Sequence, residues 1–170
     1  MALVIENGTV VAGANSFATV AQLRAFANLR GVVLPVADAD VEILLVKAAD
    51  FICSKNFIGN LVSISQPLCW PRANAYISQD LESPYLLPSN EVPAGIVRAQ
   101  CQLAIDALST DLMPNGDGKE VVREKVDVLE VEYAKSGTGV SNPVLQKAEA
   151  LLSIFYKTES LFTGLRSIRA

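Results

Sequence analysis

The sequence predicts a mainly α-helical domain, organised as about four helices around one core, with a small β component. Three observations predict this class. Apolar residues recur at helical spacing in four segments, alternating residues flank an Asn7-Gly8 pair, and a second alternating stretch covers residues 121–133. Because hydrophobic residues make up 51% of the 170 residues and charged residues only 19%, the chain can form one proper core without long disorder.

The first segment predicts a small β arm. Residues Leu3 to Val11 place apolar side chains on both sides of Asn7-Gly8, and this dipeptide is the strongest short signal for a β-hairpin. The expected organisation is a β arm over residues 1–14, a helical domain over 15–156 and a C-terminal tail over 157–170.

Two helices are expected after the arm. Thr19, with Gln22 three residues later, forms a capping box, and apolar residues then recur at helical spacing until a glycine ends the turn. Residues 32–37 form a connector stiffened by a proline. Asp38 then caps a second helix, which is expected to fade around residues 56–59.

Two further helices are expected in the second half of the chain. Pro93 fits the first turn of a helix whose apolar positions cover a wide arc, so we expect this helix to be central and buried on more than one side. Asn142 and Pro143 supply a cap and first-turn pair for a fourth helix, whose apolar stripe ends at Phe155.

The stretch 121–133 is expected to form the one long strand region. Its apolar phase changes between Val128 and Leu129, since the apolar residues before this point lie on one face and those after it on the other. A β-bulge, a change of neighbouring strand or burial of both faces by another subunit explains such a change. We favour the subunit contact, which makes Val128, Val131 and Tyr133 candidate interface residues.

A long ordered loop, residues 61–88, separates the second and third helices. It contains Gln66-Pro-Leu-Cys-Trp-Pro-Arg72, in which two prolines favour an extended, stiff backbone around the only tryptophan. Trp70 is expected to be buried with its indole N–H on an acceptor, and Arg72 to pair with a carboxylate or a helix C-terminus. From these residues alone, a core corner with a satisfied arginine is favoured over a binding site.

The residues of the chain do not predict catalysis, a metal or a cofactor. No histidine is present, so triads that use histidine as the base cannot form, and the cluster Asp38, Asp40, Glu42 suits helix capping better than acid–base chemistry. Cys53, Cys69 and Cys101 lack any CxxC spacing. They are interpreted as buried free thiols of a protein made in a reducing cytoplasm.

The net charge of −4 argues against a protein whose main task is to bind phosphates. Two local basic groups exist, one formed by Lys119, Arg123 and Lys125 and the other by Arg166 and Arg169. The first residues lack the features of a signal peptide, and no stretch approaches the ~20 apolar residues of a membrane span.

The segment Gln66–Arg72, followed by Val92-Pro-Ala-Gly-Ile-Val-Arg-Ala99, resembles the head-tail adaptor (connector, or head-completion) proteins of tailed bacteriophages. The same family is also labelled DnaT-like single-stranded-DNA-binding proteins. Asn15-Ser16-Phe17 and Val126-Asp-Val-Leu-Glu-Val-Glu-Tyr133 extend the resemblance, in the expected order, over residues 15–156. The residues before Asn15 have no counterpart in this pattern.

The resemblance implies a structural virion protein in the neck between head and tail, made in the cytoplasm of a bacterial host. Such adaptors assemble into a ring, commonly a dodecamer, that contacts the portal on one side and a tail-side connector or tail terminator protein on the other. DNA passes through the lumen without being read, and an acidic lining does not hold a sliding duplex. The tail over 157–170 is expected either to pack on its own domain or to dock on a partner.

Two other functions compete with this hypothesis. A DnaT-like protein that binds single-stranded DNA would use Arg72, Tyr76 and Tyr85 with the basic residues near Lys119, although acidic residues lie between the tyrosines. A histidine-free enzyme is the weaker alternative. For the adaptor, the candidate interface residues are Trp70, Arg72, Tyr76, Val128, Val131, Tyr133, Phe162 and Leu165.

Overall fold

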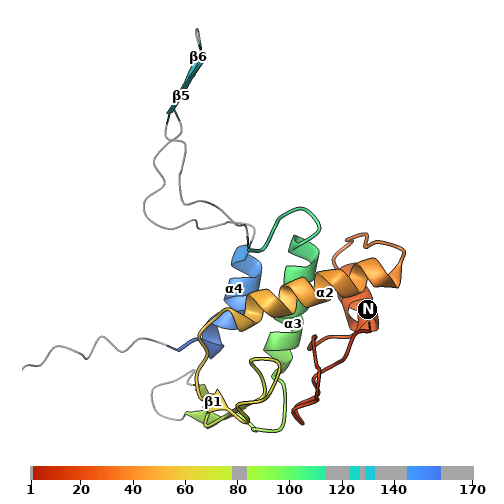
Figure 1. Ribbon diagram of the computed structural model, residues 1–170, viewed down its shortest axis with the longest axis vertical. Coiled ribbons are helices and arrows are strands. Elements are labelled where there is room, and N and C mark those ends of the chain that lie inside the picture. The colour runs from red at the N-terminus through yellow and green to blue at the C-terminus, as the bar shows by residue number, and fades with distance from the viewer. Residues whose placement is uncertain (1, 78–83, 114–122, 127–128, 133–144, 158–170) are drawn as a thin grey trace, which may run out of the picture.

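The computed structural model describes residues 2–77, 84–113, 123–126, 129–132 and 145–157. A helical body with several short strands makes up these residues (Figure 1). The helices are α1 (Val20–Asn28), α2 (Asp38–Cys53), α3 (Ala94–Asp106) and α4 (Gln146–Leu152), and a 3-10 helix over Ser153–Phe155 continues α4.

Helix α3 is the centre of the body, because α1, α2 and α4 all pack against it (Figure 1). Ile96, Ala99 and Leu103 are fully buried along it. The prediction of a central, multiply buried third helix is confirmed. The predicted class, helical with a small β component, is also confirmed, whereas a four-helix bundle is not, since α2 crosses α3 and the other two helices are only 9 and 7 residues long.

A buried glutamine joins the centre of α3 to two other segments. The side chain of Gln100 donates from Nε2 to Ser16 Oγ (2.9 Å) and to the carbonyl oxygen of Leu45 (2.8 Å). Its Oε1 accepts from the backbone N–H of Phe17 at 2.9 Å. These bonds offset the cost of burying an amide and fix the N-terminal segment and α2 on α3.

The observed helix ends agree in part with those predicted from the sequence. The capping box of Thr19 and Gln22 is confirmed at the start of α1. Asp38 is the first residue of α2 and not its cap, because Ala37 occupies that position and the Asp38 carboxylate binds Arg24 instead. Helix α2 ends at Cys53, earlier than expected, and Asn142 and Pro143 lie outside the described residues.

The described strands form three antiparallel pairs, each of two strands. The first two pairs are very short and lie in the long segment between α2 and α3, where they brace an irregular backbone. The pairs are β1 (Asn60–Leu61) with β2 (Arg72–Ala73), β3 (Tyr76–Ile77) with β4 (Tyr85–Leu86), and β5 (Arg123–Val126) with β6 (Leu129–Glu132).

The strand region predicted over 121–133 is confirmed in its described part, but it consists of two antiparallel strands and not of one long strand. Val126 lies opposite Leu129, so β5 and β6 fold back on each other across a two-residue connection. The change of apolar phase coincides with this connection. Reversal of the chain explains it without the bulge or the subunit contact that the sequence suggested.

The predicted N-terminal hairpin is also wrong. The buried carboxylate of Glu6 accepts from the backbone N–H groups of Gly8 (2.8 Å), Val10 (3.1 Å) and Val11 (2.8 Å), and a hairpin ladder needs such groups for its own bonds. The segment before Glu6 pairs instead with Ser16, whose carbonyl oxygen accepts from Glu6 N–H at 2.8 Å. The chain bends after Asn7, with Gly8 at φ +105° and the N–H of Thr9 donating to Asn7 Oδ1 at 3.1 Å.

Candidate interaction surfaces

Trp70 lies in the core and contributes no surface. It is 0% exposed, and its ring meets Phe57 and Phe155 edge to face, with centroids 5.8 and 5.7 Å apart. Among the described residues no acceptor binds its indole N–H, in contrast to the expectation from the sequence. The peptide bond that joins Trp70 to Pro71 is cis.

Arg72 has a structural role, because its guanidinium holds together the backbone of the loop that follows α2. Burial lowers the pKa of its guanidinium. With its donors directed at backbone carbonyls, Arg72 is not presented to a phosphate or a partner chain. The sequence interpretation of a core corner with a satisfied arginine is confirmed, with carbonyls in place of a carboxylate. The acceptors are the carbonyl oxygens of Phe57 (3.3 Å), Ile58 (2.7 Å), Gly59 (2.9 Å) and Cys69 (3.2 Å).

A disulfide joins Cys53, the last residue of α2, to Cys69 in the loop. The prediction of free thiols is therefore wrong for this pair. It is correct for Cys101, which is a buried free cysteine in α3. Burial raises the pKa of its thiol to about 11. The bond fixes the segment around Trp70 to the helix end that it covers.

A cluster of polar and aromatic side chains joins α4 and the residues after it to the end of α2. Lys55 Nζ donates to Glu149 Oε1 at 2.8 Å, and the Tyr156 hydroxyl donates to the other oxygen of the same carboxylate. Burial, followed by the hydrogen bond and the charge of Glu149, raises the pKa of Tyr156 above its usual range. Tyr156 also packs on Phe57, with ring centroids 5.7 Å apart.

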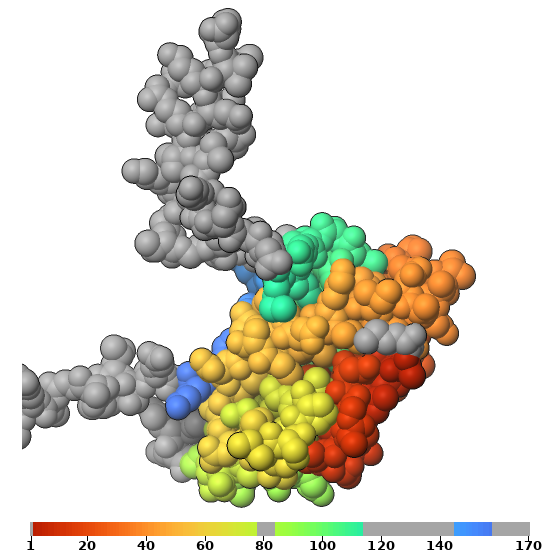
Figure 2. All heavy atoms as spheres, viewed as in Figure 1, coloured from red at the N-terminus to blue at the C-terminus, as the bar shows by residue number. Residues whose placement is uncertain are grey.

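Exposed apolar side chains also occur on the loops between α2 and α3, on more than one face of these loops, and we call this region the loop surface. Figure 2 shows the segments that carry it side by side on one end of the body. The sequence singled out Tyr76 and Tyr85 but missed their neighbours, whose signal is an apolar run without helical spacing. The surface consists of Leu61, Val62, Ile64, Tyr76, Tyr85 and Leu86, of which Ile64 is 100% exposed.

The two tyrosines of the loop surface do not form one stacking platform. In the pairing of β3 with β4, Tyr76 lies opposite Leu86 and Ile77 lies opposite Tyr85. Residues that lie directly opposite share a face of the ribbon, so the tyrosines fall on opposite faces. Tyr76 and Tyr85 are 52% and 61% exposed, respectively.

A second exposed apolar surface lies on the connector between α1 and α2, and we call it the connector surface. It consists of Leu29, Val33 and Val36, which are 84%, 89% and 95% exposed. Figure 1 places the connector at the start of α2 and the strands of the loop surface beyond its other end. The sequence predicts a connector here, stiffened by a proline, but it does not predict that the apolar side chains of this connector lie outside the core.

Several cations of the described residues are engaged within the chain. Arg24 Nη2 forms an ion pair with Asp38 at 2.6 Å, Lys55 binds Glu149, and Arg72 binds carbonyls. The guanidinium of Arg30 lies over the ring of Phe26, 3.4 Å from its centroid. These four cations of the described residues therefore have partners within the chain.

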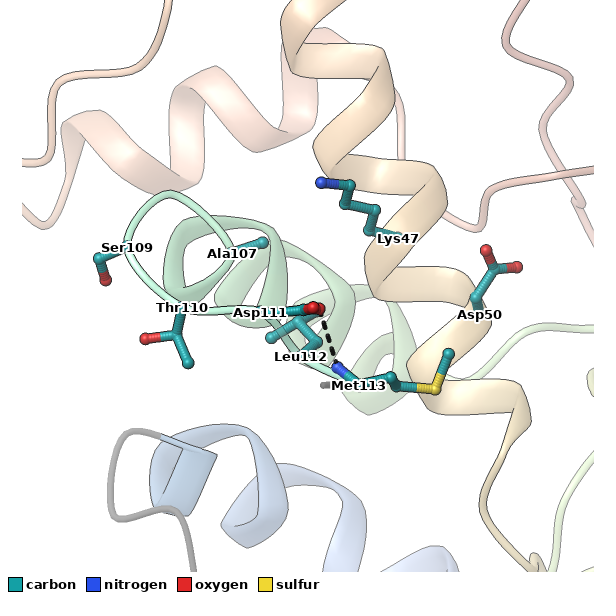
Figure 3. A pocket seen from close by; sticks show the side chains of 8 residues that line it. All are labelled: Lys47, Asp50, Ala107, Ser109, Thr110, Asp111, Leu112 and Met113. Atoms are coloured by element: carbon teal, nitrogen blue, oxygen red, sulfur yellow. Dashed lines mark hydrogen bonds between the residues drawn. The ribbon is translucent and has the colours of Figure 1, made fainter. Parts of the chain in front are cut away.

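An open hollow of about 500 Å³ lies between α2 and the segment after α3. Lys47 and Asp50 line it from α2, and Asp111 and Met113 face them from the other side (Figure 3). The Asp111 carboxylate accepts from the backbone N–H of Met113 at 3.2 Å. With one cation and two carboxylates, this lining does not favour an anion such as phosphate.

The remaining predicted interface residues lie largely outside the described ranges. Val128, Tyr133, Phe162 and Leu165 are all outside them. Val131 belongs to β6, where it lies opposite Glu124. The structure brings Tyr76 to the surface, buries Trp70 and engages Arg72 internally.

The described residues hold no group of three or more side chains suited to bind a metal ion. None of the described helices has the length and hydropathy that a bilayer crossing requires.

The family model described as "Putative DnaT-like ssDNA binding protein" matches residues 1–170, the whole chain. No curated protein and no solved structure matches the chain. The chain therefore belongs to the DnaT-like ssDNA binding protein family that this model describes.

Proposed function

We propose that this protein is a subunit of a protein assembly, and that the assembly is a head-tail adaptor ring of a tailed bacteriophage. The observation that supports assembly is the pair of separate apolar surfaces, the connector surface and the loop surface, at the two ends of α2. A ring of identical subunits needs two different surfaces on each copy, because each contact joins one to the other. Exposed apolar patches of this kind are typical of protein contacts.

The charges of the body support association with proteins more than binding of phosphates. Arg24, Arg30, Lys55 and Arg72 are each held by partners within the chain. The net charge of −4 acts in the same direction, since non-specific DNA binding depends on many free cations.

The specific role as an adaptor rests on the resemblance of Gln66–Arg72 and Val92–Ala99 to adaptor proteins. In that role the ring sits in the neck of the virion, with the portal on one side and a tail-side connector or tail terminator protein on the other. DNA passes through the lumen, and the subunit performs no catalysis. The buried, cross-linked loop around Trp70 then serves as a rigid support for the surfaces that meet these partners.

Light scattering of the full chain over a range of concentrations tests this function. We expect wild type to form a closed oligomer and Ile64→Asp, on the loop surface, to dissociate it. Ala150→Asp, at an exposed position of α4, introduces the same charge elsewhere and serves as the control. A wild-type chain that remains monomeric, alone and with a portal protein, contradicts the proposal.

Single-stranded DNA binding is the second candidate, and the family description favours it. The exposed rings of Tyr76 and Tyr85 are the best stacking positions in the described residues. This function predicts an affinity for single-stranded DNA that falls steeply with salt and falls again in Tyr85→Ala. The adaptor predicts no such complex, so fluorescence anisotropy with a labelled oligonucleotide at two salt concentrations separates the two functions.

A further inference from the structure

We propose that the connector surface binds the C-terminal segment, residues 158–170, of a second copy of this chain. The inference rests on the proposed assembly and names the contact that would build it. It combines three observations: a connector held rigidly with apolar side chains outward, a C-terminal segment with matching apolar spacing and charge, and the point where the described chain ends.

The connector is fixed by its backbone and not by its side chains. Arg24 donates from Nη1 to the carbonyl oxygen of Pro35 (3.1 Å) and from Nη2 to that of Val36 (2.9 Å). The N–H of Val32 donates to the carbonyl oxygen of Ala27 at 3.0 Å, which holds the other end of the connector to α1. The apolar side chains are thereby presented in a fixed arrangement, which lowers the entropy cost of binding.

A hollow and an acidic edge adjoin these side chains. The hollow, of about 240 Å³, lies between α1 and the connector, with Ala27, Val32 and Val33 in its lining. The first turn of α2 adds the exposed carboxylate of Asp40, beside Asp38, whose own carboxylate is paired with Arg24. A ligand suited to this surface is therefore amphipathic, with apolar side chains for the connector and cations for the helix start.

The sequence of residues 158–170 has this composition. Leu161, Leu165 and Ile168 recur at helical spacing, with Phe162 beside the first of them. Arg166 and Arg169 supply the cations that complement the acidic start of α2. An amphipathic helix in a groove is a common form of peptide recognition, and it requires this combination of residues.

The end of the described chain favours the segment of a second copy. Lys157 N–H donates to the carbonyl oxygen of Asn56 at 3.1 Å, which places it near the end of α2, whereas the connector lies at the start. The 16 residues of α2 span about 24 Å. A helix of residues 158–170 extends only about 20 Å from Lys157, so in this conformation it does not lie along its own connector surface.

Mixing two variants of the full chain tests the contact between copies. Val36→Asp damages the connector surface and leaves the C-terminal segment intact, while Phe162→Asp does the opposite. We expect each change to raise the dissociation constant of self-association about tenfold or more, while Ala150→Asp, on the exposed side of α4, does not. An equimolar mixture of the two variants retains one intact contact, so it is expected to form a species of twice the monomer mass.

Three outcomes overturn the inference, and they separate it from the proposed function. If both variants assemble as wild type does, assembly stands but this contact is wrong. If the mixture stays monomeric and each variant has a lower melting temperature, the segment binds its own chain. If wild type never assembles, both proposals fail. Val33→Asp, at a second exposed connector position, checks that loss of assembly does not come from misfolding of Val36→Asp, with circular dichroism as the control for each variant.

Discussion

The loop Gln66–Arg72 and the connector between α1 and α2 are held in the same way but turn their side chains in opposite directions. In each, one arginine donates to backbone carbonyls, Arg72 in the loop and Arg24 in the connector. The loop buries Trp70 beneath it, whereas the connector leaves its valines in solvent. A rigid backbone is therefore found both in a segment that supports the core and in a segment that could contact a partner. The direction of the apolar side chains distinguishes the two.

The largest effect on stability is expected from truncating the buried side chain of the loop, Trp70. Trp70→Ala removes the ring that packs on Phe57 and Phe155, and we expect a loss of about 3–5 kcal/mol in the free energy of unfolding. Urea denaturation measures it. Tyr85→Ala removes an exposed ring and is expected to cost less than about 0.5 kcal/mol. Similar losses in the two variants would show that Trp70 is not in the core.

The disulfide is the next test of the loop. Cys53 and Cys69 are separated by 16 residues, and a closed loop of this size stabilises the folded state by about 3 kcal/mol in the chain-entropy model. We expect dithiothreitol to lower the melting temperature of wild type. The double variant Cys53→Ala with Cys69→Ala should not respond to the reductant, and an equal response in both would place the effect elsewhere.

Arg72 and its role in the loop can be separated from any role in DNA binding. Arg72→Lys replaces a planar guanidinium that reaches several carbonyls with a single ammonium group. We expect the free energy of unfolding to fall by about 1–3 kcal/mol, because buried carbonyl oxygens lose their donors. Thermal denaturation gives the stability, and anisotropy gives the DNA affinity. A variant with unchanged stability but weaker binding of single-stranded DNA would move Arg72 to a DNA surface.

The cluster beside the loop predicts a dependence on alkaline pH. The folded state raises the pKa of Tyr156, so its stabilising contribution is complete below the unfolded pKa near 10 and is lost as pH rises above it. Because the side chain is only half-buried, the loss of unfolding free energy with pH should stay below about 1.4 kcal/mol per pH unit, which is the value for one fully coupled proton. In a comparison of unfolding at pH 9 and pH 11, Tyr156→Phe should lose less stability than wild type.

The smallest effect is expected on the exposed side of the comparison. Val36→Ser changes a side chain that makes almost no contact within its own chain, so we expect the free energy of unfolding to change by less than about 0.5 kcal/mol. Chemical denaturation of the monomer measures this. A loss above about 1 kcal/mol would mean that the connector packs within the chain and is not a contact surface.

Local signals in the sequence predicted local structure well. The capping box of Thr19 and Gln22 and the arc of apolar residues on α3 depend on neighbours within one or two turns, and both are confirmed. The N-terminal hairpin failed because the Glu6 carboxylate competes for the same N–H groups, a contact that spacing does not reveal. The single strand expected over 121–133 failed because the sequence between β5 and β6 carries no glycine that would signal a reversal of the chain.

The candidate surfaces were harder to predict because they depend on which apolar residues remain outside. Trp70 and Val36 are both apolar and both adjoin a proline, yet one is fully buried and the other is exposed. The disulfide was missed for a similar reason, since only the path of the loop across the end of α2 brings Cys53 and Cys69 together. Tertiary position, which has no short sequence pattern, decides each case.

Gln100 has a consequence for the order in which the chain folds. Its bonds to Ser16 and Phe17 cross more than 80 residues of sequence, so they form only after a long loop has closed. Contacts of this separation slow folding and are gained late if they lie outside the nucleus. Replacing Gln100 with methionine should then mainly speed unfolding and leave the folding rate nearly unchanged, which makes this side chain a reporter of the last step in closing the core.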